Sequence, residues 1–325
     1  MIAPRLQALI EQLADGRFHS GESLGKALGI SRAAIWKMVP KLESLGLEVY
    51  AVTGKGYRLS MPITTLQPTA ILAQLPAESR SCLADIEVFS ELDSTNRYLL
   101  QAAINSAPSG SACLAEYQSG GRGRRGRHWA SPYGGNLYLS LLWRFNDGTA
   151  RLGGLSLAVA VALMRLLQEL EIEGAGIKWP NDILVNGKKL AGILLDVAGE
   201  SNGPCHVVIG IGLNFQMSER QAVDIGQPWT DLRKLGVSMD RNQVAGCLLH
   251  HLLQVLVVYQ AQGLHAFLDE WRRWDLAYDS EIAIHHGNEA VRGIARGIDE
   301  QGMLLVEQSG DLRRYASGEV SLRLA

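Results

Sequence analysis

The chain contains 325 residues, 47% of them hydrophobic, and has a formal net charge of −2. This length exceeds what one compact core usually spans, so we expect two or three domains, and the near-neutral charge argues against a protein that attracts nucleic acid over its whole surface. Residues 1–60 nevertheless carry eight Lys and Arg against five Asp and Glu, a balance of +3 that leaves −5 for the remainder, and so predict a local anion-binding module at this end.

The segment 1–62 shows three short helical patterns followed by a β-hairpin. Helices are expected over residues 4–16, 20–30 and 30–46. The third starts at Ser31, a good N-cap, and stops at Gly46. Two β-prone runs then flank Gly54-Lys55-Gly56, which indicates a hairpin. This order predicts a winged helix-turn-helix domain over residues 1–62, in which the third helix enters the major groove of DNA.

Five residues of this domain are candidates for DNA contact: Ser31, Arg32, Trp36, Lys37 and Lys55. Lys55 stands at the tip of the hairpin, where it can touch phosphate. Trp36 occupies a position where a small polar side chain is expected, so it is either a core anchor or a bulky contact in the groove. Pro40 lies inside the helix, removes one backbone donor and should kink the helix or restrict its straight part. A small helical protein-interaction module remains the alternative to DNA binding.

The middle of the chain, about residues 68–270, mixes strands and helices after a proline-rich linker at 61–76, near whose end a short helix is expected. Strands are expected over 86–92, 111–118, 136–145, 177–197 and 206–215, and helices over 93–104, 153–170, 241–260 and 264–274. The 177–197 segment contains Asn186-Gly187 between apolar runs, a strong hairpin signal. Consecutive hairpins favour a mixed or antiparallel sheet with helices packed on it, an α+β domain. Residues 272–325 are rich in strands and turns and predict a small β-barrel.

Several features argue against a zinc site, secretion or a membrane partner. The four cysteines are far apart, lack CxxC or Cys/His spacing, and predict reduced thiols in a cytoplasmic protein. No basic-then-apolar leader opens the chain. The most apolar run, from Leu152 to Met164, is too short to span a bilayer and predicts a buried helix. His250-His251 and His285-His286 are expected to be solvated or core histidines without a partnered acid or cysteine.

The loop at residues 120–129 reads GGRGRRGRHW and contains four arginines and no acid. Glycine at alternating positions lets backbone N–H groups approach an anion closely. The arginines between them supply planar guanidinium groups that suit phosphate and carboxylate. A nucleic-acid backbone, a small phosphate ligand and a merely solvated basic loop all remain possible from these residues alone. Because only His128 and Trp129 follow before apolar strands, the loop lacks the extended aromatic and basic surface of many nucleic-acid binders.

Three further clusters place polar groups at the ends of predicted strands. Asp93-Ser94-Thr95-Asn96 offers hydroxyls, an amide and backbone donors at a helix N-terminus, suited to a neutral urea or carbonyl group or to an anion, or simply to capping the helix. Residues 178–182 combine a cation, an aromatic ring and an acid, and Asp182 is suited to Mg²⁺ held through a phosphate. Lys189 precedes Gly192 in a largely apolar strand, where it is either a site residue or a solvent-facing edge residue.

Five segments together resemble the biotin protein ligase family. They are DSTNR at 93–97, YQSGGRGRRGRHW at 117–129, KWPND at 178–182, KKLAGI at 188–193 and IGIGLNF at 209–215. Each segment alone is weak, but the set is highly specific, and the resemblance extends over essentially the whole chain. The winged-helix start, with GKGYRL in its hairpin, is similar to that of the bifunctional bacterial members, which also repress biotin synthesis genes.

The resemblance implies a three-part fold: a winged helix, a catalytic domain of the class II synthetase type and an SH3-like C-terminal barrel. It implies a reaction in two steps. Biotin carboxylate attacks the α-phosphate of ATP, with Mg²⁺ as cofactor, and a lysine of the biotin carboxyl carrier protein of acetyl-CoA carboxylase then attacks the biotinyl-5′-adenylate. Operator DNA and a second copy of the chain, in a ligand-dependent homodimer, are the further implied partners. Such chemistry depends on positioning and charge neutralisation more than on a protein nucleophile.

The resemblance also implies roles for residues of these segments. The catalytic candidates are Arg122, Lys178 and Lys189, of which Arg122 and Lys189 would counter charge on the biotin carboxylate and the α-phosphate. The biotin-binding candidates are Ser94, Thr95, Asn96, Gln118, Arg122, Gly123, Arg124, Lys189 and Gly192. The adenylate-binding candidates are Arg124, Arg127, Trp129, Asn181 and Asn214. Asp182 is the candidate Mg²⁺-linked acid. Since all of these lie after Asp93, the winged-helix segment 1–62 is expected to be separable from ligation.

Three alternatives remain open. A lipoate ligase of the same fold would lack the Ser, Thr, Asn and Gln set that suits a ureido ring. A non-enzymatic, ligand-sensing repressor would not need Lys189 and the KWPND segment together with four loop arginines. A ligase whose winged helix no longer binds DNA is compatible with every feature of the sequence, and Trp36 and Pro40 leave the operator sequence undetermined.

Overall fold

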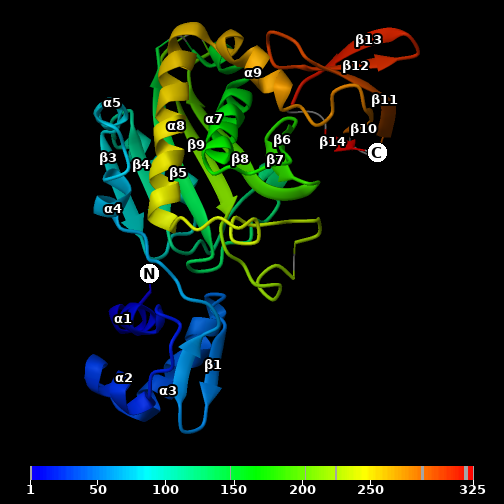
Figure 1. Cartoon of the computed structure of the whole chain (residues 1–325). Coiled ribbons are helices and arrows are strands. Elements are labelled where there is room, and N and C mark those ends of the chain that lie inside the picture. Colours follow the sequence, from blue (N-terminus) through cyan, green and yellow to red (C-terminus); the bar gives the residue numbers. More distant parts are fainter. Residues whose placement is uncertain are drawn as a thin grey trace.

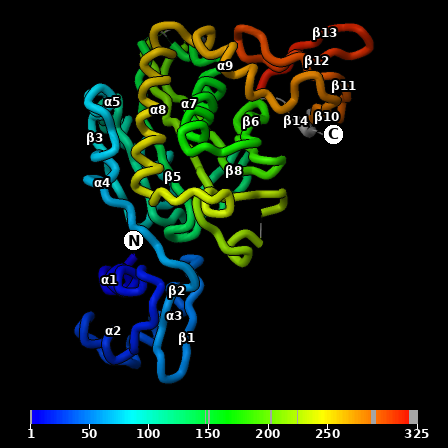
Figure 2. The backbone as a smooth tube through the Cα atoms, viewed as in Figure 1, coloured from blue at the N-terminus to red at the C-terminus, as the bar shows by residue number. Residues whose placement is uncertain are grey.

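The computed structural model consists of an N-terminal helical unit with a hairpin, a central unit built on a large sheet, and a small C-terminal sheet (Figure 1). It describes residues 2–146, 148–201, 203–223, 225–286, 289–317 and 321–324. The backbone trace places the N-terminal unit and the C-terminal sheet at opposite ends of the central unit (Figure 2). A mixed-sheet domain between a winged helix and a small antiparallel sheet confirms the predicted α+β class.

The N-terminal unit is a winged helix. Its elements are α1 (Pro4–Leu13), α2 (Gly21–Leu28), α3 (Arg32–Ser44), β1 (Val49–Val52) and β2 (Gly56–Leu59). Ser20 and Ser31 cap α2 and α3, because their hydroxyls accept hydrogen bonds from the backbone N–H groups of Ser23 at 3.0 Å and Ala34 at 3.2 Å. β1 and β2 pair antiparallel and form the wing, with Lys55 in its turn. The predicted order of three helices and a hairpin is confirmed.

Helix α3 presents Trp36 and Pro40 to solvent. Trp36 is 66% exposed, so its interpretation as a core anchor is wrong. The helix runs to Ser44 with Pro40 inside it, so Pro40 does not end the helix. Pro40 cannot donate a hydrogen bond to the carbonyl of Trp36, but both residues lie on the exposed side of the helix, where water can satisfy that carbonyl.

The core of the winged helix is completed by a residue of the central unit. Tyr133 is buried among the apolar side chains of α1 and α3, which include Leu9 and Ile35. The backbone N–H of Tyr133 donates to the carbonyl of Leu45 at 2.9 Å. The turn that ends α3 is therefore bonded directly to the central unit, and the two units share apolar packing.

The central unit contains a seven-stranded sheet in the order β3-β4-β5-β9-β8-β7-β6. The strands are β3 (Asp85–Phe89), β4 (Ser111–Ala115), β5 (Asn136–Phe145), β6 (Ala175–Lys178), β7 (Asp182–Val185), β8 (Lys188–Gly199) and β9 (Cys205–Asn214). β3 and β4 are parallel, and the other neighbouring pairs are antiparallel, which confirms the mixed sheet. β7 and β8 meet at Asn186 and Gly187, whose φ angles of 49° and 75° belong to the tight hairpin turn predicted from this dipeptide.

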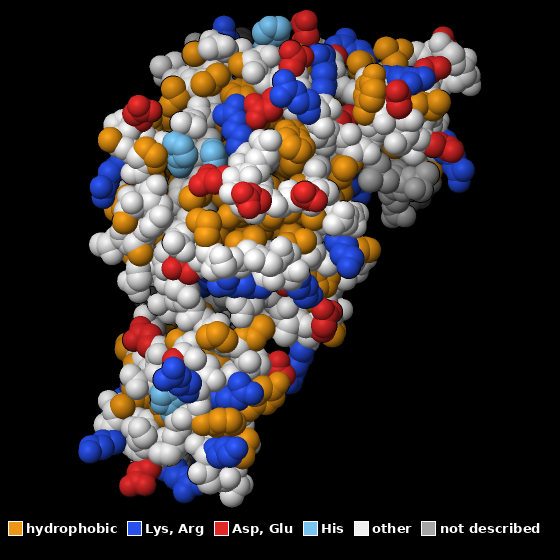
Figure 3. Space-filling model, viewed as in Figure 1, with side chains coloured by type: hydrophobic (Ala, Val, Ile, Leu, Met, Phe, Trp, Pro, Cys, Tyr) orange, Lys and Arg blue, Asp and Glu red, His pale blue; other side chains and the backbone are white. Residues whose placement is uncertain are grey.

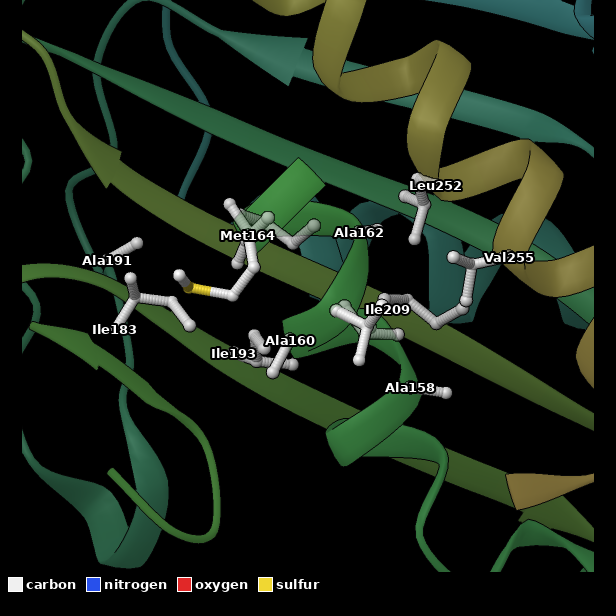
Figure 4. Close-up of a cluster of buried hydrophobic side chains, with 14 of the residues drawn as sticks. Ala158, Ala160, Ala162, Met164, Ile183, Ala191, Ile193, Ile209, Leu252 and Val255 are labelled. Carbon is white, nitrogen blue, oxygen red and sulfur yellow. The ribbon is translucent and has the colours of Figure 1, made fainter. Parts of the chain in front are cut away.

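Helices pack on both faces of this sheet. They are α4 (Pro68–Leu72), α5 (Ala77–Cys82), α6 (Thr95–Ile104), α7 (Leu155–Glu169), α8 (Arg241–Gln262) and α9 (Leu268–Arg273), with short 3₁₀ turns η1 (Arg124–Gly126), η2 (Thr149–Leu152) and η3 (Leu264–Phe267). Ala158, Ala160 and Ala162 of α7 are buried beside Ile193 and Ile209 of the sheet (Figure 4). Their small side chains allow the helix to lie close to the strands. α6 covers the other face and leaves part of it open for the site described below.

Helix α8 is long and apolar enough to cross a bilayer, since it has 22 residues with a mean hydropathy of 1.5 over its most apolar window. However, 61% of that window is buried inside the protein. Leu252 and Val255 of α8 lie in the same cluster as the alanines of α7 (Figure 4). Its apolar composition is therefore explained by packing in the core.

The C-terminal unit is a five-stranded antiparallel sheet in the order β13-β12-β11-β10-β14. Its strands are β10 (Glu281–His286), β11 (Glu289–Ile298), β12 (Leu304–Gln308), β13 (Asp311–Tyr315) and β14 (Ser321–Leu324). The indole N–H of Trp179 in the central unit donates to the carbonyl of Gly302 at 3.1 Å. This bond joins the C-terminal unit to the segment that carries the KWPND motif.

A buried ion pair holds the linker between the first two units. The guanidinium of Arg241 lies 2.6 Å from the carboxylate of Glu116, and the two side chains are 1% and 4% exposed. Glu116 accepts a hydrogen bond from the backbone N–H of Leu66 at 2.5 Å, and Arg241 donates to the carbonyls of Thr64 at 3.1 Å and Asn136 at 2.8 Å. Each charge is both paired and hydrogen-bonded, the condition under which the burial of two charges is tolerated.

We expect Arg241→Met to lower the free energy of unfolding by about 3–5 kcal/mol, because it leaves the carboxylate of Glu116 buried without its counter-ion. Urea unfolding measures the loss. Arg272→Met is the control, because Arg272 pairs with Asp269 at the surface, where an ion pair contributes far less. Equal losses in the two variants would contradict the structural role of the buried pair.

Candidate active site

A cavity of about 1200 Å³ brings the predicted site residues together. All of the residues assigned to ligand chemistry from the sequence line it: Ser94, Thr95, Asn96, Gln118, Arg122, Gly123, Arg124, Arg127, Trp129, Lys178, Asn181, Asp182, Lys189, Gly192 and Asn214. They come from the start of α6, the segment after β4, the strands β6 to β9 with their connections, and the arginine loop, as we call residues 120–129. Segments far apart in the sequence therefore meet around one space.

One wall of the cavity is neutral and hydrogen-bonded. The side-chain carbonyl of Gln118 accepts from the backbone N–H of Thr95 at 2.9 Å and from its hydroxyl at 3.2 Å. The hydroxyl of Ser140 lies 2.7 Å from that of Thr95 and 2.6 Å from the amide oxygen of Asn96. The amide nitrogen of Asn96 donates to Asp196 at 2.8 Å. These side chains are fixed by one another before any ligand arrives, so this wall is preorganised.

Ser94 adds a further hydroxyl to this wall. It is the N-cap of α6 and is 4% exposed, but its side chain makes no capping hydrogen bond. The expectation of an ordinary cap is therefore wrong for its hydroxyl. The N-terminus of α6 lies at this wall, and a helix N-terminus favours an acceptor or an anion.

Lys189 belongs to a second wall of the cavity, which carries cations. Its Nζ is 2.8 Å from Oδ1 of Asp182 and 5.3 Å from the centroid of the Trp129 ring. The side chain is 15% exposed, because β8 is an interior strand of the sheet. The alternative of a solvent-facing edge lysine is therefore wrong. A lysine enclosed with one carboxylate and an aromatic face is placed to meet an anion that enters the cavity.

The indole of Trp129 rests on a floor of two glycines. Gly192 of β8 and Gly212 of β9 face each other in the sheet. A Cβ added to Gly192 would lie 3.1 Å from Trp129, and one added to Gly212 would lie 2.5 Å from it, so the ring needs glycine at the second position. The indole N–H is buried and has no hydrogen-bond partner among the described residues. This N–H is thus available to donate a hydrogen bond to a ligand.

The arginine loop is folded on itself. The backbone N–H of Gly123 donates to the carbonyl of Arg127 at 2.7 Å, and that of Trp129 donates to Gly121 at 3.0 Å. Arg125 adopts a φ of 58° at the tip. Gly121 leaves no room for a Cβ, which would lie 2.4 Å from the hydroxyl of Ser131. These contacts hold the loop as a short hairpin with its arginines around the mouth of the cavity.

Two arginines of the loop already contact the walls. Arg122 lies 3.6 Å from the carboxylate of Asp196, and its side chain is 39% exposed. Arg124 donates to the side-chain oxygen of Asn181 at 3.1 Å and to the carbonyl of Ser317 in the C-terminal unit. Burial, followed by the charge of Arg125, lowers the pKa of Arg124 from its usual value. An anion beside these groups would relieve both the desolvation and the repulsion.

The two asparagines expected to contact adenylate brace the backbone in this structure. The amide of Asn181 donates to the carbonyl of Ile193 at 2.7 Å. The amide of Asn214 donates to the carbonyls of Lys189 at 3.3 Å and Thr230 at 3.0 Å. Their Nδ2 atoms position the strand that carries Lys189.

A second loop, residues 215–230, was not predicted to be part of the site. Asp224 of this loop lies outside the described residues. Gln221, Ile225, Gln227 and Trp229 line the cavity, and the backbone N–H of Lys189 donates to the carbonyl of Pro228 at 2.9 Å. The signal in the sequence was weak: a long segment without predicted elements after a strand that belongs to the site, with one tryptophan near its end.

The winged helix also reaches the cavity, which the expected separation of residues 1–62 from ligation did not anticipate. Ser44, Leu45 and Gly46, the turn that ends α3, line its edge. The side-chain amide of Gln221 donates to the carbonyl of Gly46 at 2.6 Å. Pro132 packs closely against Gly46: a Cβ added to Gly46 would lie only 2.8 Å from the Cβ of Pro132. The second loop and the segment that follows the arginine loop therefore connect to the end of the helix that is predicted to read DNA.

The five DNA-contact candidates lie on the N-terminal unit. Arg32, Trp36 and Lys37 are exposed on α3, and Lys55 is exposed at the tip of the wing. Ser31 is exposed as well, but its hydroxyl is used to cap α3.

One histidine pair departs from expectation. His251 lies 2.8 Å from Glu169, which also accepts a hydrogen bond from the thiol of Cys247 at 3.3 Å. An acid and a cysteine distant in the sequence therefore meet at His251, because α7 packs against α8. Burial, reinforced by Glu169, raises the pKa of the Cys247 thiol to about 12. No group of three His, Cys, Asp or Glu suited to a metal ion occurs in the part of the chain that the structure describes.

Three family models match the chain. The HTH domain matches residues 5–58, the biotin/lipoate A/B protein ligase family matches residues 88–214, and the biotin protein ligase C terminal domain matches residues 279–323. "Bifunctional ligase/repressor BirA" of Escherichia coli (strain K12) is 42% identical over 317 residues, which cover 98% of this chain and 97% of that protein. The protein of the same name from Bacillus subtilis (strain 168) is 33% identical, with 95% of each chain covered.

A solved structure supports the same relationship. "Biotin protein ligase from Aquifex aeolicus in complex with biotin and ATP" is similar with a TM-score of 0.64 at 27% identity, covering 75% of this chain and all of that one. The fold and the matched models first define a DNA-binding domain joined to an acyl ligase. The chain belongs to the family of bifunctional biotin protein ligases. Because these relatives and the C-terminal model concern biotin, the alternatives of a lipoate ligase and a non-enzymatic sensor are set aside.

We expect Arg122→Gly to leave the fold intact and to weaken the retention of adenylate, because one charge-assisted contact in a shielded site contributes roughly 2–4 kcal/mol. Release of labelled biotinyl adenylate into solution measures the effect. Arg125→Gly is the matched control, because Arg125 stands at the loop tip with a φ that glycine adopts easily, and it should release less. Unchanged release from Arg122→Gly would remove this residue from the site.

Proposed function

We propose that the chain activates biotin with ATP, forming biotinyl-5′-adenylate and pyrophosphate, and then transfers biotin to a lysine of the biotin carboxyl carrier protein of acetyl-CoA carboxylase. We also propose that the adenylate-bound protein represses biotin synthesis genes by binding operator DNA. The observation that carries the ligase proposal is the cavity, in which a neutral hydrogen-bonding wall adjoins a wall of cations. Biotinyl adenylate has a neutral ring system at one end, an acyl phosphate in the middle and adenosine at the other end.

The neutral wall suits the ureido ring of biotin. A cyclic urea offers one carbonyl acceptor and two N–H donors, and the wall presents hydroxyl donors together with amide and hydroxyl acceptors. We assign Ser94, Thr95, Asn96 and Gln118 to this end of the ligand. Because Ser140 and Asp196 already orient Thr95 and Asn96, little ordering cost remains to be met when biotin binds.

The cationic wall suits the reacting groups. Attack of a carboxylate on a phosphate ester brings two anions together, so the protein must neutralise charge and hold the atoms in line. We assign this task to Arg122, Lys178 and Lys189, with Gly123 and Gly192 allowing close approach of the ligand to the backbone. The adenylate would be held by Arg124, Arg127 and Trp129. Asn181 and Asn214 would support this part of the site by positioning the backbone. The ion pair with Asp182 holds the ammonium group of Lys189 in place.

The residues fit a Mg²⁺ ion that arrives with ATP. Asp182 is the carboxylate beside the cationic wall, and Lys189 engages its Oδ1 atom. One protein carboxylate together with phosphate oxygens and water is the usual coordination of Mg²⁺ in nucleotide sites. When bound, the ion would supply further neutralisation of phosphate charge.

Repression requires the winged helix to bind specifically. One winged helix makes few phosphate contacts, so two copies on adjoining half-sites are generally needed at physiological salt. We therefore propose a ligand-dependent homodimer of a cytoplasmic protein without a membrane partner. The turn that ends α3 is contacted by the second loop through Gln221 and by Tyr133, which follows the arginine loop. These contacts support a link between ligand and DNA binding.

A single-turnover experiment tests the ligase proposal. Labelled biotin, ATP, Mg²⁺ and a carrier domain should together give labelled carrier with the wild-type chain. Lys189→Ala should lose adenylate formation to a greater extent than transfer from supplied biotinyl adenylate, because its ammonium group is aimed at the charge that develops in the first step. Equal losses in both steps would assign Lys189 to binding only, and unlabelled carrier with the wild type would overturn the ligase proposal.

Sedimentation and a gel-shift assay test the repressor proposal. Biotin plus ATP should shift the protein from monomer to dimer and, at fixed salt, produce a specific shift of DNA upstream of biotin synthesis genes. Dimerisation without a specific shift would retain the ligase and discard the repressor. Absence of both would leave a monofunctional ligase with an inactive winged helix.

A further inference from the structure

The outer face of α3 is defined by the burial pattern of its side chains. Ile35 and Leu42 are fully buried in the winged-helix core. From its start to Lys41, the exposed positions of the helix repeat at helical spacing and form one continuous strip: Arg32, Ala33, Trp36, Lys37, Pro40 and Lys41. Glu43 and Ser44, which are also exposed, lie in the last turn. In a helix-turn-helix domain, this strip is the surface that meets the base edges.

The chemistry of this strip is unusual for a surface that reads bases. Residues 31–42 contain no Asp, Glu, Asn, Gln or Thr. Their one hydroxyl, that of Ser31, accepts a hydrogen bond from the backbone N–H of Ala34 at 3.2 Å and caps the helix. The side chains that usually read adenine are Asn and Gln, and those that accept from cytosine are Asp and Glu. Only cationic and apolar side chains remain on this strip to contact the bases.

Trp36 dominates the apolar part of the strip. At 66% exposed it presents more of its surface than any other aromatic side chain among the described residues. Arg32 precedes it by one helical turn, and Lys37 follows it directly. The single apolar group that the major groove offers is the 5-methyl of thymine. A thymine methyl group opposite this indole would allow both apolar surfaces to be buried away from water.

The wing carries cations of its own that are suited to contact the DNA backbone. The guanidinium of Arg58 lies 5.2 Å from the ring centroid of Phe18 and 4.8 Å from that of Tyr50, and Nζ of Lys55 lies 5.8 Å from Phe18. Aromatic faces thus hold two cations on the hairpin. Figure 3 shows Lys and Arg side chains at the free end of this unit. With phosphate contacts supplied there, α3 is available to discriminate bases.

We propose that Trp36 is the specificity-determining residue of the DNA-binding domain and that it selects thymine through the 5-methyl group. This inference rests on the proposed repressor function. The cations beside it contact guanine or phosphate, so each half-site contains at least one thymine whose methyl group, rather than its hydrogen-bonding edge, is read. An acidic protein partner on the same face is the competing occupant and is an outcome of the test.

The test starts with the full chain in the presence of biotin, ATP and Mg²⁺, which is used to select its preferred duplex from a random pool. Each thymine of the selected half-site is then replaced by deoxyuridine, which removes only the methyl group. We expect at least one replacement to weaken wild-type binding about fourfold per methyl at fixed salt. Trp36→Ala should bind the thymine duplex more weakly and should not distinguish thymine from uracil at that position. Trp36→Phe should retain part of the discrimination.

Two controls separate this effect from general damage. Ile104→Ala changes another exposed apolar side chain, 71% exposed on α6 and away from the DNA-binding unit, and should leave the methyl effect intact. The thermal midpoint of Trp36→Ala should stay near that of the wild type, because the side chain is not part of the core.

The outcomes distinguish this inference from the proposed repression. A selected site with no methyl dependence, or with equal dependence in wild type and Trp36→Ala, would overturn the role of Trp36 and leave the repressor intact. Failure to select any sequence would overturn both, and binding of α3 to an acidic protein instead of DNA would be the explanation to pursue.

Discussion

The buried ion pair between Glu116 and Arg241 is the contact on which the relation between ligand site and DNA-binding unit depends. It lies where the linker enters the central unit, and its hydrogen bonds hold Thr64 and Leu66 of the linker and Asn136 of β5 at once. Without it, two buried charges would be left unpaired, and the linker would lose its attachment to the sheet. A charged pair is costly to bury, but it fixes positions that apolar packing alone would leave less well defined.

The cavity follows from this attachment. Three parts of the chain border it: the arginine loop, the second loop and the turn at the end of α3. Tyr133, shortly beyond the arginine loop, bonds to Leu45, and Gln221 of the second loop bonds to Gly46. A ligand that moves either segment would therefore act on the base of the helix that is predicted to read DNA, and such coupling would be reciprocal. The proposed ligand site and the proposed DNA-reading helix share one structural junction.

The sequence allowed the fold class, the winged helix and the mixed sheet to be predicted, because these depend on local periodicity, caps and turn dipeptides such as Asn186-Gly187. The candidate ligand residues could be named from the family motifs, and they do line one cavity. What could not be predicted arises from packing across long separations. Gln221 lies in a loop without a motif, Gly46 appeared only as the end of a helix, and Glu169 meets His251 because two helices pack together. The exposure of Trp36 was likewise undecided until its neighbours were placed.

Hydrogen–deuterium exchange of the full chain, with and without biotin and ATP, tests the central claim most directly. If one ligand is enclosed by all three segments, the backbone amides of residues 120–129, of the second loop and of the turn at Leu45–Gly46 should all exchange more slowly when adenylate forms. The exchange rates of the backbone amides of α8, a helix of the core, should change little. Protection confined to the arginine loop, with no change at the end of α3, would contradict the account of a junction between the two functions.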